Sequence, residues 1–299
     1  MSEFNFDGRV AVVTGAGRGI GRAYALLLAE RGARVVVNDL GGSMEGDGAD
    51  IEPASSVAAE IGVAGGEAIA DASDVAAEGG AQELIDTAVA RFGRLDVLVN
   101  NAGIMRWAGF PEADADNLAA HHAVHVAGSF NTARAAWPHM VDAGYGRIVM
   151  TTSTGVFGLP KNLSYATAKA GVVGMTRSLT TAGAAHGIKV NLIAPAAFTR
   201  MSGKPSGDIE SQMAPELVAP MVAFLAHEAC PVSGEIYVAG ASRFARLFVA
   251  STEGYVHSGP APTVEDVAAH WDAINDESDY YVPADLPGWS AEFMRHLRD

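Results

Sequence analysis

Short apolar runs alternate with helical patterns from the start of this chain to about residue 240. The runs predicted as strands are 10–13, 34–38, 67–70, 95–99, 147–152, 189–193 and 235–238. Helical patterns lie between them, as in the βαβ units of parallel sheets. The run 95–99 is apolar enough for a strand that is buried on both faces. The sequence therefore predicts a doubly wound α/β fold with a seven-stranded parallel sheet.

After Gly240 this alternation stops, and a proline-containing segment carries one clear helical pattern. Thr263 is expected to cap that helix, and apolar residues recur along it at positions 264, 267, 268, 271 and 274. We therefore expect a dinucleotide-binding domain over residues 1–250 and a helical C-terminal extension over 251–299. The apolar stripe requires a covering surface, on the domain itself or on a partner subunit.

Charge and cysteine content exclude several classes of function. The 299 residues carry a formal net charge of −15, which argues against a nucleic-acid partner because phosphate binding needs a basic patch. No apolar run approaches the ~18 residues of a membrane span, and the N-terminus lacks the pattern of a signal peptide. The single cysteine, Cys230, is expected to be a small buried residue and fits a reducing, cytoplasmic location.

A glycine-rich turn lies between the first predicted strand and the first predicted helix, with the pattern T-G-x-x-x-G-x-G over residues 14–21. Glycines there let the backbone approach a pyrophosphate, which the N-H groups of the helix receive. The alternative is a flexible turn without a ligand. The expected cofactor contacts are Gly15, Arg18, Gly19, Ile20 and Gly21. This pattern resembles that of short-chain dehydrogenases/reductases, and the resemblance extends from about residue 7 to 240.

Asp39 ends the second predicted strand, where a carboxylate can accept hydrogen bonds from an adenosine ribose and repel a 2′-phosphate. We therefore expect NAD rather than NADP, although Arg18 favours the phosphate weakly. The resemblance implies further cofactor contacts in turns that follow the third, fourth and sixth strands. These are Asp74, Val75, Asn101, Ala102, Gly103, Pro195 and Thr199.

Tyr165 and Lys169 are four residues apart on a predicted helix, so a phenol and an ammonium share one face. A free tyrosine has a pKa of ~10, and lowering it to near neutrality requires about 3 to 4 kcal/mol in favour of the phenolate. A neighbouring ammonium contributes to that shift. A pair at this spacing can also be a solvated surface contact. The resemblance implies that Tyr165 is the base and that Lys169 also binds the nicotinamide ribose.

In the family, a serine at the end of the fifth strand acts with the tyrosine, and two residues compete for that position. Counting back 13 residues from Tyr165 leads to Thr152, whereas counting forward along the strand from Arg147 leads to Ser153. A one-residue deletion fits a loop better than a buried strand, where it would turn every later side chain to the other face. We therefore favour Ser153 and keep Thr152 as the alternative.

His125 stands where most members of the family have an asparagine that relays protons through water. Histidine can also carry protons, so a relay role for His125 stays open. His121 and His125 have the spacing of metal ligands on a helix. No third ligand is evident and hydride transfer needs no metal, so no metal site is expected.

Several stretches resemble the (3R)-hydroxyacyl-CoA dehydrogenase unit of peroxisomal multifunctional enzyme type 2, among them 38–42, 122–137, 193–195, 218–220 and 227–230. This likeness implies oxidation of a (3R)-hydroxyacyl-CoA to its 3-ketoacyl-CoA in a homodimer or homotetramer. A hydroxysteroid, or a sterol side-chain thioester, is the alternative substrate. A non-catalytic NAD-binding protein is the rival from another class.

The segment 196–207 combines apolar and basic residues, as a mobile lid over an apolar substrate would. An ordinary surface loop is the alternative. Arg200 and Lys204 in this segment, with Arg243 and Arg246 further on, are basic residues in an acidic chain. They could receive the phosphates of coenzyme A.

Overall fold

The computed structural model describes residues 4–200 and 209–297. The chain divides into two compact units, Met1–Arg246 and Leu247–Asp299, and each is described by itself. Met201 and Lys204 of the predicted lid lie outside the described residues.

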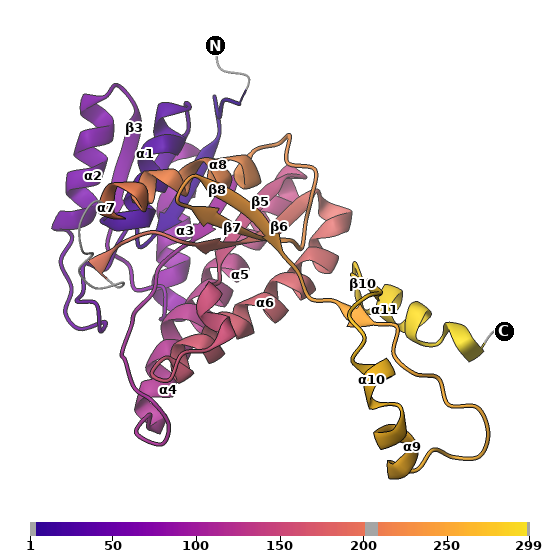
Figure 1. The fold of residues 1–299 in the computed structure, drawn as a ribbon. Coiled ribbons are helices and arrows are strands. Elements are labelled where there is room, and N and C mark those ends of the chain that lie inside the picture. Colours follow the sequence, from indigo (N-terminus) through magenta and orange to yellow (C-terminus); the bar gives the residue numbers. More distant parts are fainter. Residues whose placement is uncertain (1–3, 201–208, 298–299) are drawn as a thin grey trace. The chain divides into compact units, whose positions relative to one another are not determined.

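The first unit contains an eight-stranded sheet with the order β3-β2-β1-β4-β5-β6-β7-β8 (Figure 1). Every pairing from β3 to β7 is parallel. The strands are β1 (Val10–Thr14), β2 (Arg34–Asn38), β3 (Glu67–Asp71), β4 (Val97–Asn100), β5 (Gly146–Thr151), β6 (Ile188–Pro195), β7 (Ile236–Gly240) and β8 (Arg243–Leu247). The chain runs outward from β1 in both directions, so the predicted doubly wound sheet is confirmed.

The eighth strand, β8, was not predicted. It follows β7 after only Ala241 and Ser242, which have φ values of 48° and 57°. Two residues with positive φ form the tight turn of a hairpin, which joins antiparallel neighbours. The strand's sequence, Arg-Phe-Ala-Arg-Leu, is almost entirely exposed. An exposed edge strand after a turn without glycine or asparagine lacks the apolar run from which the other strands were predicted.

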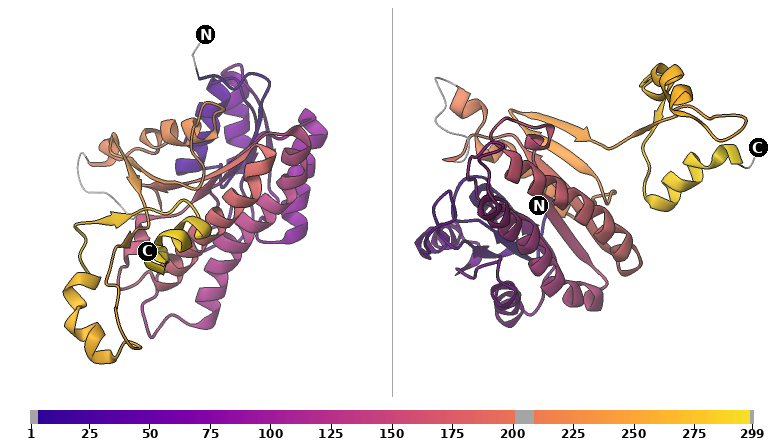
Figure 2. Two further views of the ribbon diagram at one scale, coloured as in Figure 1. Left: turned by 90° about the vertical axis from the view of Figure 1, so that its right-hand side faces the viewer. Right: turned by 90° about the horizontal axis from the view of Figure 1, so that it is seen from below.

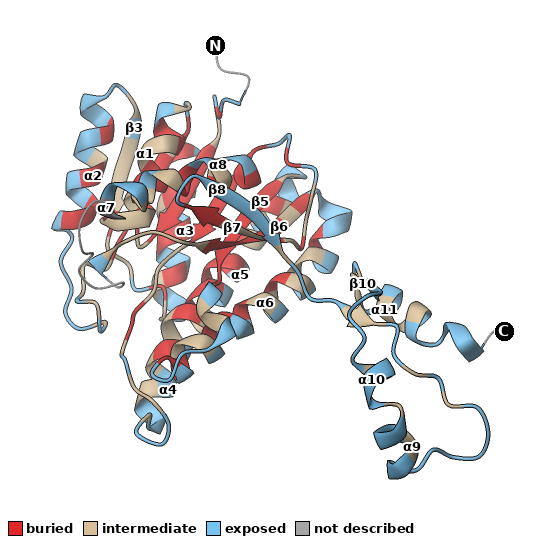
Figure 3. Ribbon diagram, in the orientation of Figure 1, coloured by how far each residue is buried: buried red, intermediate tan, exposed pale blue. Residues whose placement is uncertain are grey.

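Helices cover both faces of the sheet (Figures 1 and 2). Helix α1 packs against α2 and α8 on one face, and α3 packs against α5 on the other. The helices are α1 (Gly19–Glu30), α2 (Glu52–Val63), α3 (Glu78–Phe92), α4 (Ala115–His121), α5 (Gly128–Ala143), α6 (Leu163–Gly183), α7 (Ile209–Gln212) and α8 (Ala219–Ala226). Their apolar sides bury the central strands of the sheet, whereas the edge strand β8 is pale blue in Figure 3. Cys230 is free and fully buried, as predicted.

The helical segment between β4 and β5 is not one continuous α-helix. A π-helical stretch, His122–Ala127, separates α4 from α5. Such stretches are rare and occur mostly as single turns within α-helices, often at functional sites. This one carries His125 and begins directly after His121.

The second unit has two short strands, β9 (Ser251–Thr252) and β10 (Tyr280–Tyr281), and the helices α9 (Val264–Ala269), α10 (Trp271–Ile274) and α11 (Leu286–Phe293). Thr263 caps α9 in a capping box with Asp266, as predicted. None of the residues 247–297 is buried, and Val264 and Trp271 of the apolar stripe are 80% and 58% exposed. The packing of this extension on a domain or partner stays a prediction. No helix within the described ranges has both the length and the apolar character of a membrane span.

Candidate active site

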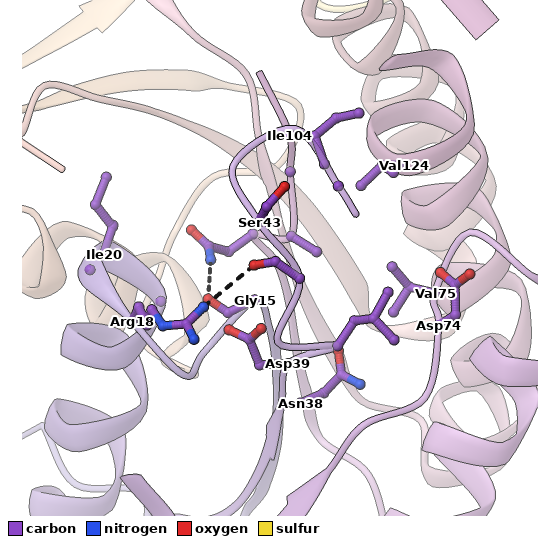
Figure 4. Close-up of a pocket in the computed structure, with 18 of the residues that line it drawn as sticks. Gly15, Arg18, Ile20, Asn38, Asp39, Ser43, Asp74, Val75, Ile104 and Val124 are labelled. Atoms are coloured by element: carbon purple, nitrogen blue, oxygen red, sulfur yellow. Dashed lines mark hydrogen bonds between the residues drawn. The ribbon is translucent and has the colours of Figure 1, made fainter. Parts of the chain in front are cut away.

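A cavity of about 350 Å³ lies where the strand order reverses, beyond the carboxyl ends of β1, β2 and β4 (Figure 4). Most of the predicted cofactor contacts line it: Gly15, Arg18, Gly19, Ile20, Gly21, Asp39, Asp74, Val75, Asn101, Ala102, Gly103 and Thr199. Pro195, Tyr165 and Lys169 do not. The loop after β2 also lines the cavity through Gly42, Ser43 and Gly46, as do Ile104 and Arg200. Sequence reasoning assigned no cofactor contacts to that loop.

The glycine turn is shaped by close contacts that leave no room for side chains. A Cβ on Gly21 would lie 2.2 Å from the Gly15 carbonyl oxygen, and Gly19 has a φ of +54° where helix α1 begins. Asn101, which follows the neighbouring strand β4, holds the turn in place. Its Nδ2 donates to the carbonyl oxygens of Thr14 (2.9 Å) and Gly15 (3.0 Å). The turn therefore presents backbone and helix N-H groups to the cavity, as a pyrophosphate requires.

Asp39 lines the cavity beside the glycine turn and has little exposure. Its Oδ2 accepts a hydrogen bond from the Gly17 N-H (2.8 Å) and its Oδ1 accepts one from the Gly41 N-H (2.7 Å). Each carboxylate oxygen keeps a further lone pair, so the group can still accept hydrogen bonds from two ribose hydroxyls.

Two arginines meet beside Asp39, at the carbonyl oxygen of Gly42. Arg18 donates to this oxygen at 3.5 Å and Arg200 donates to it at 3.2 Å. Burial, together with the charge of Arg18, lowers the pKa of Arg200, while Asp39 opposes this shift. The cavity thus gathers local positive charge in a chain whose net charge is −15. That charge favours an anionic ligand such as a pyrophosphate.

The structure distinguishes the two hydroxyl groups, of Ser153 and Thr152, that were candidates for the position beside Tyr165. Ser153 and Tyr165 adjoin at Gly155, where an added Cβ would lie 3.2 Å from both Ser153 Oγ and Tyr165 Cε1. The Ser153 Oγ accepts the Gly155 N-H at 2.9 Å. Thr152 is buried, and its Oγ1 donates to the Lys169 carbonyl oxygen at 2.9 Å. Ser153 is therefore the hydroxyl that adjoins the phenol, while Thr152 fastens β5 to helix α6.

Lys169 is deeply buried and Tyr165 is partly buried, and this changes their proton affinities. Burial lowers the pKa of Lys169 to about 7, and its Nζ donates to the Thr151 carbonyl oxygen at 2.9 Å. Burial raises the pKa of Tyr165, and only the neighbouring Ser153 hydroxyl opposes this. The helical spacing led us to expect a pKa lowered by Lys169. That direction is not found, because the Nζ lies 5.6 Å from the ring centroid and faces a carbonyl oxygen.

Two histidines enclose the other side of Tyr165. The His125 ring lies edge-on to the phenol ring with centroids 5.3 Å apart, and His121 does so at 6.3 Å. The Nε2 of His125 lies 2.9 Å from the Ile104 carbonyl oxygen, close enough to donate to it. Its Nδ1 is buried and has no hydrogen-bond partner among the described residues. Burial, and next the charge of Lys169, hold the pKa of His125 well below its usual value, so the imidazole is neutral.

Tyr165 adjoins one end of the cavity through His125. A Cβ on Gly103, which lines the cavity, would lie 2.5 Å from Cε1 of His125. His125 packs in turn on Tyr165. The described part of the chain contains no cluster of three potential metal ligands around these histidines. The geometry thus combines a dinucleotide-shaped cavity with a hydroxyl, a phenol and an amine, a set able to exchange a proton with an alcohol oxygen.

The basic residues considered for coenzyme A do not form one group. Arg200 lines the dinucleotide cavity. Arg243 and Arg246 lie on the edge strand β8, where Arg246 pairs with Glu235 at 2.7 Å.

Comparisons with known proteins agree with this geometry. The family model of short chain dehydrogenases matches residues 9–207. A short-chain type dehydrogenase/reductase of Mycobacterium tuberculosis is 44% identical over 90% of this chain and 95% of its own. The peroxisomal multifunctional enzyme type 2 of Mus musculus is 42% identical over 94% of this chain and only 38% of the enzyme, so this chain spans about two fifths of that relative. The hydroxyacyl-CoA dehydrogenase ChsB1 of M. tuberculosis is 37% identical over 78% of both chains.

Solved structures give the same result. Full-length peroxisomal multifunctional enzyme type 2 from Drosophila melanogaster matches with a TM-score of 0.83 and 33% identity, over 98% of this chain and 50% of that one. A 7α-hydroxysteroid dehydrogenase complexed with NADH and 7-oxo glycochenodeoxycholic acid matches with a TM-score of 0.72 and 29% identity, over 80% of this chain and 95% of that one.

Proposed function

The chain belongs to the short-chain dehydrogenase family of oxidoreductases, and from that premise we propose that it oxidises the hydroxyl group of a (3R)-hydroxyacyl-CoA with NAD. The observation that carries the proposal is the adjoining pair of Ser153 and Tyr165 beside the Gly103 end of the cavity. Such a pair can hold the oxygen of a secondary alcohol and remove its proton.

In the proposed mechanism, Tyr165 accepts the hydroxyl proton while Ser153 donates a hydrogen bond to the same oxygen as it becomes a carbonyl. Lys169 would bind the nicotinamide ribose and, once the cofactor is bound, stabilise the phenolate with its ammonium. Bound NAD would supply the acceptor for the hydride of the alcohol carbon, and its positive charge would favour the phenolate. The unpartnered Nδ1 of His125 is the proposed acceptor for a water that relays the proton to solvent.

The cofactor proposal rests on the chain's own donor and acceptor groups. Because Gly21 has no side chain, a pyrophosphate can come close to the main chain of the glycine turn. Arg18 and Arg200 supply positive charge. Asp39 supplies two acceptors for a ribose and repels a 2′-phosphate. The NADH complexed with the similar hydroxysteroid dehydrogenase supports a nicotinamide cofactor. We therefore propose NAD in preference to NADP.

The substrate proposal follows the relative named hydroxyacyl-CoA dehydrogenase, which aligns over most of this chain. The 7-oxo glycochenodeoxycholic acid complexed with the hydroxysteroid dehydrogenase favours a steroid alcohol as the second candidate. A stopped-flow comparison of kcat/KM for (3R)- and (3S)-hydroxyacyl-CoAs, steroid alcohols and free hydroxy acids separates them. We expect the (3R)-thioesters to be preferred. A preference for a free steroid would support the second candidate, and no NADH formation with any alcohol would favour a non-catalytic NAD-binding protein.

Tyr165→Phe tests the mechanism directly. We expect NAD binding to persist and kcat to fall by a factor of about 10³ or more, because the base is removed while the ring stays. Tyr24→Phe is the matched control, because the Tyr24 hydroxyl is buried and without a hydrogen-bond partner among the described residues. Its kcat should equal that of the wild type. A Tyr165→Phe variant that keeps a tenth of the wild-type rate would remove Tyr165 from the mechanism.

A further inference from the structure

His121 is a fully buried histidine at the end of α4 that does not line the cofactor cavity. Both of its ring nitrogens are hydrogen-bonded. Its Nε2 accepts the backbone N-H of Arg106 at 3.2 Å, and its Nδ1 donates to the Asn117 carbonyl oxygen at 2.8 Å. These two bonds define a neutral imidazole with its hydrogen on Nδ1. One histidine thus fastens the chain that follows β4 to a helix turn.

The fastened segment, residues 104–106, is part of the wall of the cofactor cavity. Ile104 lines the cavity, and the Met105 N-H donates to the Met44 carbonyl oxygen at 2.9 Å. Arg106 donates through Nε to the Glu45 carbonyl oxygen at 2.6 Å. Met44 and Glu45 belong to the loop 41–50, whose Gly42, Ser43 and Gly46 line the same cavity. The His121 bond to Arg106 therefore supports two adjoining parts of the wall.

The opposite side of the same ring faces the reactive centre. The His121 ring meets the Tyr165 ring edge-on, with centroids 6.3 Å apart and planes at 79°. It also stacks at 6.0 Å on His125, which itself packs edge-on against Tyr165. Interiors are close-packed, so a ring at this place restricts the orientation of the phenol.

We propose that His121 is a positioning residue that couples the wall of the cofactor cavity to the orientation of Tyr165. Its nitrogen holds the 104–106 segment and its ring holds the phenol. The side chains of Asn117 and His125 also hydrogen-bond to this segment. Cofactor binding against the segment and proton transfer at Tyr165 thus both depend in part on His121. The alternative is a histidine that only completes the core. The Tyr165 part of this inference rests on the proposed function, whereas the part that concerns the cavity wall does not.

Two substitutions separate the nitrogen from the ring. His121→Gln keeps an acceptor for the Arg106 N-H and loses the ring, whereas His121→Phe keeps a ring against Tyr165 and loses the acceptor. We expect His121→Phe to raise the Kd for NADH about tenfold (~1.4 kcal/mol) and to increase hydrogen exchange at the Arg106 amide. We expect His121→Gln to keep the Kd for NADH and the hydrogen exchange at the Arg106 amide near their wild-type values. Its kcat should fall about tenfold, which is a larger loss of kcat than in His121→Phe.

The measurements are NADH fluorescence titration, hydrogen exchange of the peptide that contains Arg106, and steady-state turnover. The matched controls are His122→Gln and His122→Phe, because His122 is the next residue and is exposed. These controls should leave all three readouts unchanged. If His121→Phe does not fold, His121→Asn is compared with His121→Gln. Neither variant has a ring, and asparagine is too short to reach the Arg106 N-H, so the pair differs only in that bond.

A histidine that only completes the core would shift the Kd and kcat in parallel with the loss of stability in both variants, and that result would overturn the inference. If the wild type turns over no hydroxyacyl-CoA or steroid, the proposed function fails. Equal exchange at the Arg106 amide in the Gln and Phe variants would then still overturn the inference. If the wild type is active and both variants equal it in Kd and kcat, the inference alone fails.

Discussion

Lys169 places an ammonium in a buried site, and its replacement by methionine should change how the stability of the protein depends on pH. The residue is 4% exposed and its Nζ has one hydrogen bond, to the Thr151 carbonyl oxygen. A single neutral acceptor does not replace the hydration of a charged amine. The folded chain therefore disfavours the protonated form, whereas the unfolded chain does not.

The size of the effect follows from the difference between the two states. Burial lowers the pKa of Lys169 from 10.5 to about 7, and each pH unit of difference corresponds to ~1.36 kcal/mol. The ammonium thus destabilises the folded state by about 5 kcal/mol below pH ~7. Between pH ~7 and ~10.5 the unfolded state binds more protons than the folded state, so the free energy of unfolding rises with pH across this window. Above the unfolded pKa the cost is absent.

Urea unfolding of the wild type and Lys169→Met, without cofactor, measures this dependence. From about pH 7.5 to about pH 9.5 the free energy of unfolding of the wild type should rise by about 2 kcal/mol relative to the variant. Lys161→Met is the control, because Lys161 is exposed and water solvates its ammonium in both states. Its difference from the wild type should not change with pH. A constant difference between the wild type and Lys169→Met would refute the reasoning that burial controls this amine.

Three further predictions concern the cofactor, the hydroxyl pair and the assembly. Asp39→Ala should raise the Kd for NAD by about tenfold or more and narrow the difference between the Kd values for NAD and NADP, because two acceptors are lost. A wild type that already prefers NADP in the same titration would contradict this prediction. Ser153→Ala should lower kcat about 100-fold. Thr152→Val should keep kcat and lower the free energy of unfolding by about 1 kcal/mol, because this variant loses only the hydrogen bond to the Lys169 carbonyl oxygen. The reverse result would make Thr152 the active hydroxyl. Light scattering should give a homodimer or homotetramer rather than the 30.9 kDa monomer.

The main architecture could be read from the sequence because the relevant signals are local. Apolar runs between helical patterns define buried parallel strands, and seven of the eight strands of the main sheet were found this way. The glycine turn and Asp39 were recognisable for the same reason. A strand, a turn and a helix that follow one another in the chain bring their residues to the edge of the sheet. The edge strand β8 escaped because exposed strands carry no apolar run.

The choice between Ser153 and Thr152 needed the tertiary structure. Both residues carry a hydroxyl and are adjacent in the chain, so spacing could not distinguish them. Packing of β5 against α6 uses the Thr152 hydroxyl for a buried carbonyl oxygen and leaves Ser153 beside the phenol. The proton affinity of Tyr165 was likewise beyond the sequence. It depends on burial, and spacing along a helix does not report burial.

The sequence by itself determined the doubly wound sheet, most of the residues that line the cofactor cavity and the Tyr165–Lys169 pair, because each is encoded by residues close together in the chain. Only the tertiary structure brought Arg200 to Gly42 and His121 to Arg106. These contacts join segments that are up to 158 residues apart. A hydrogen bond between distant segments leaves no periodic or spaced pattern, since the fold alone decides which groups meet.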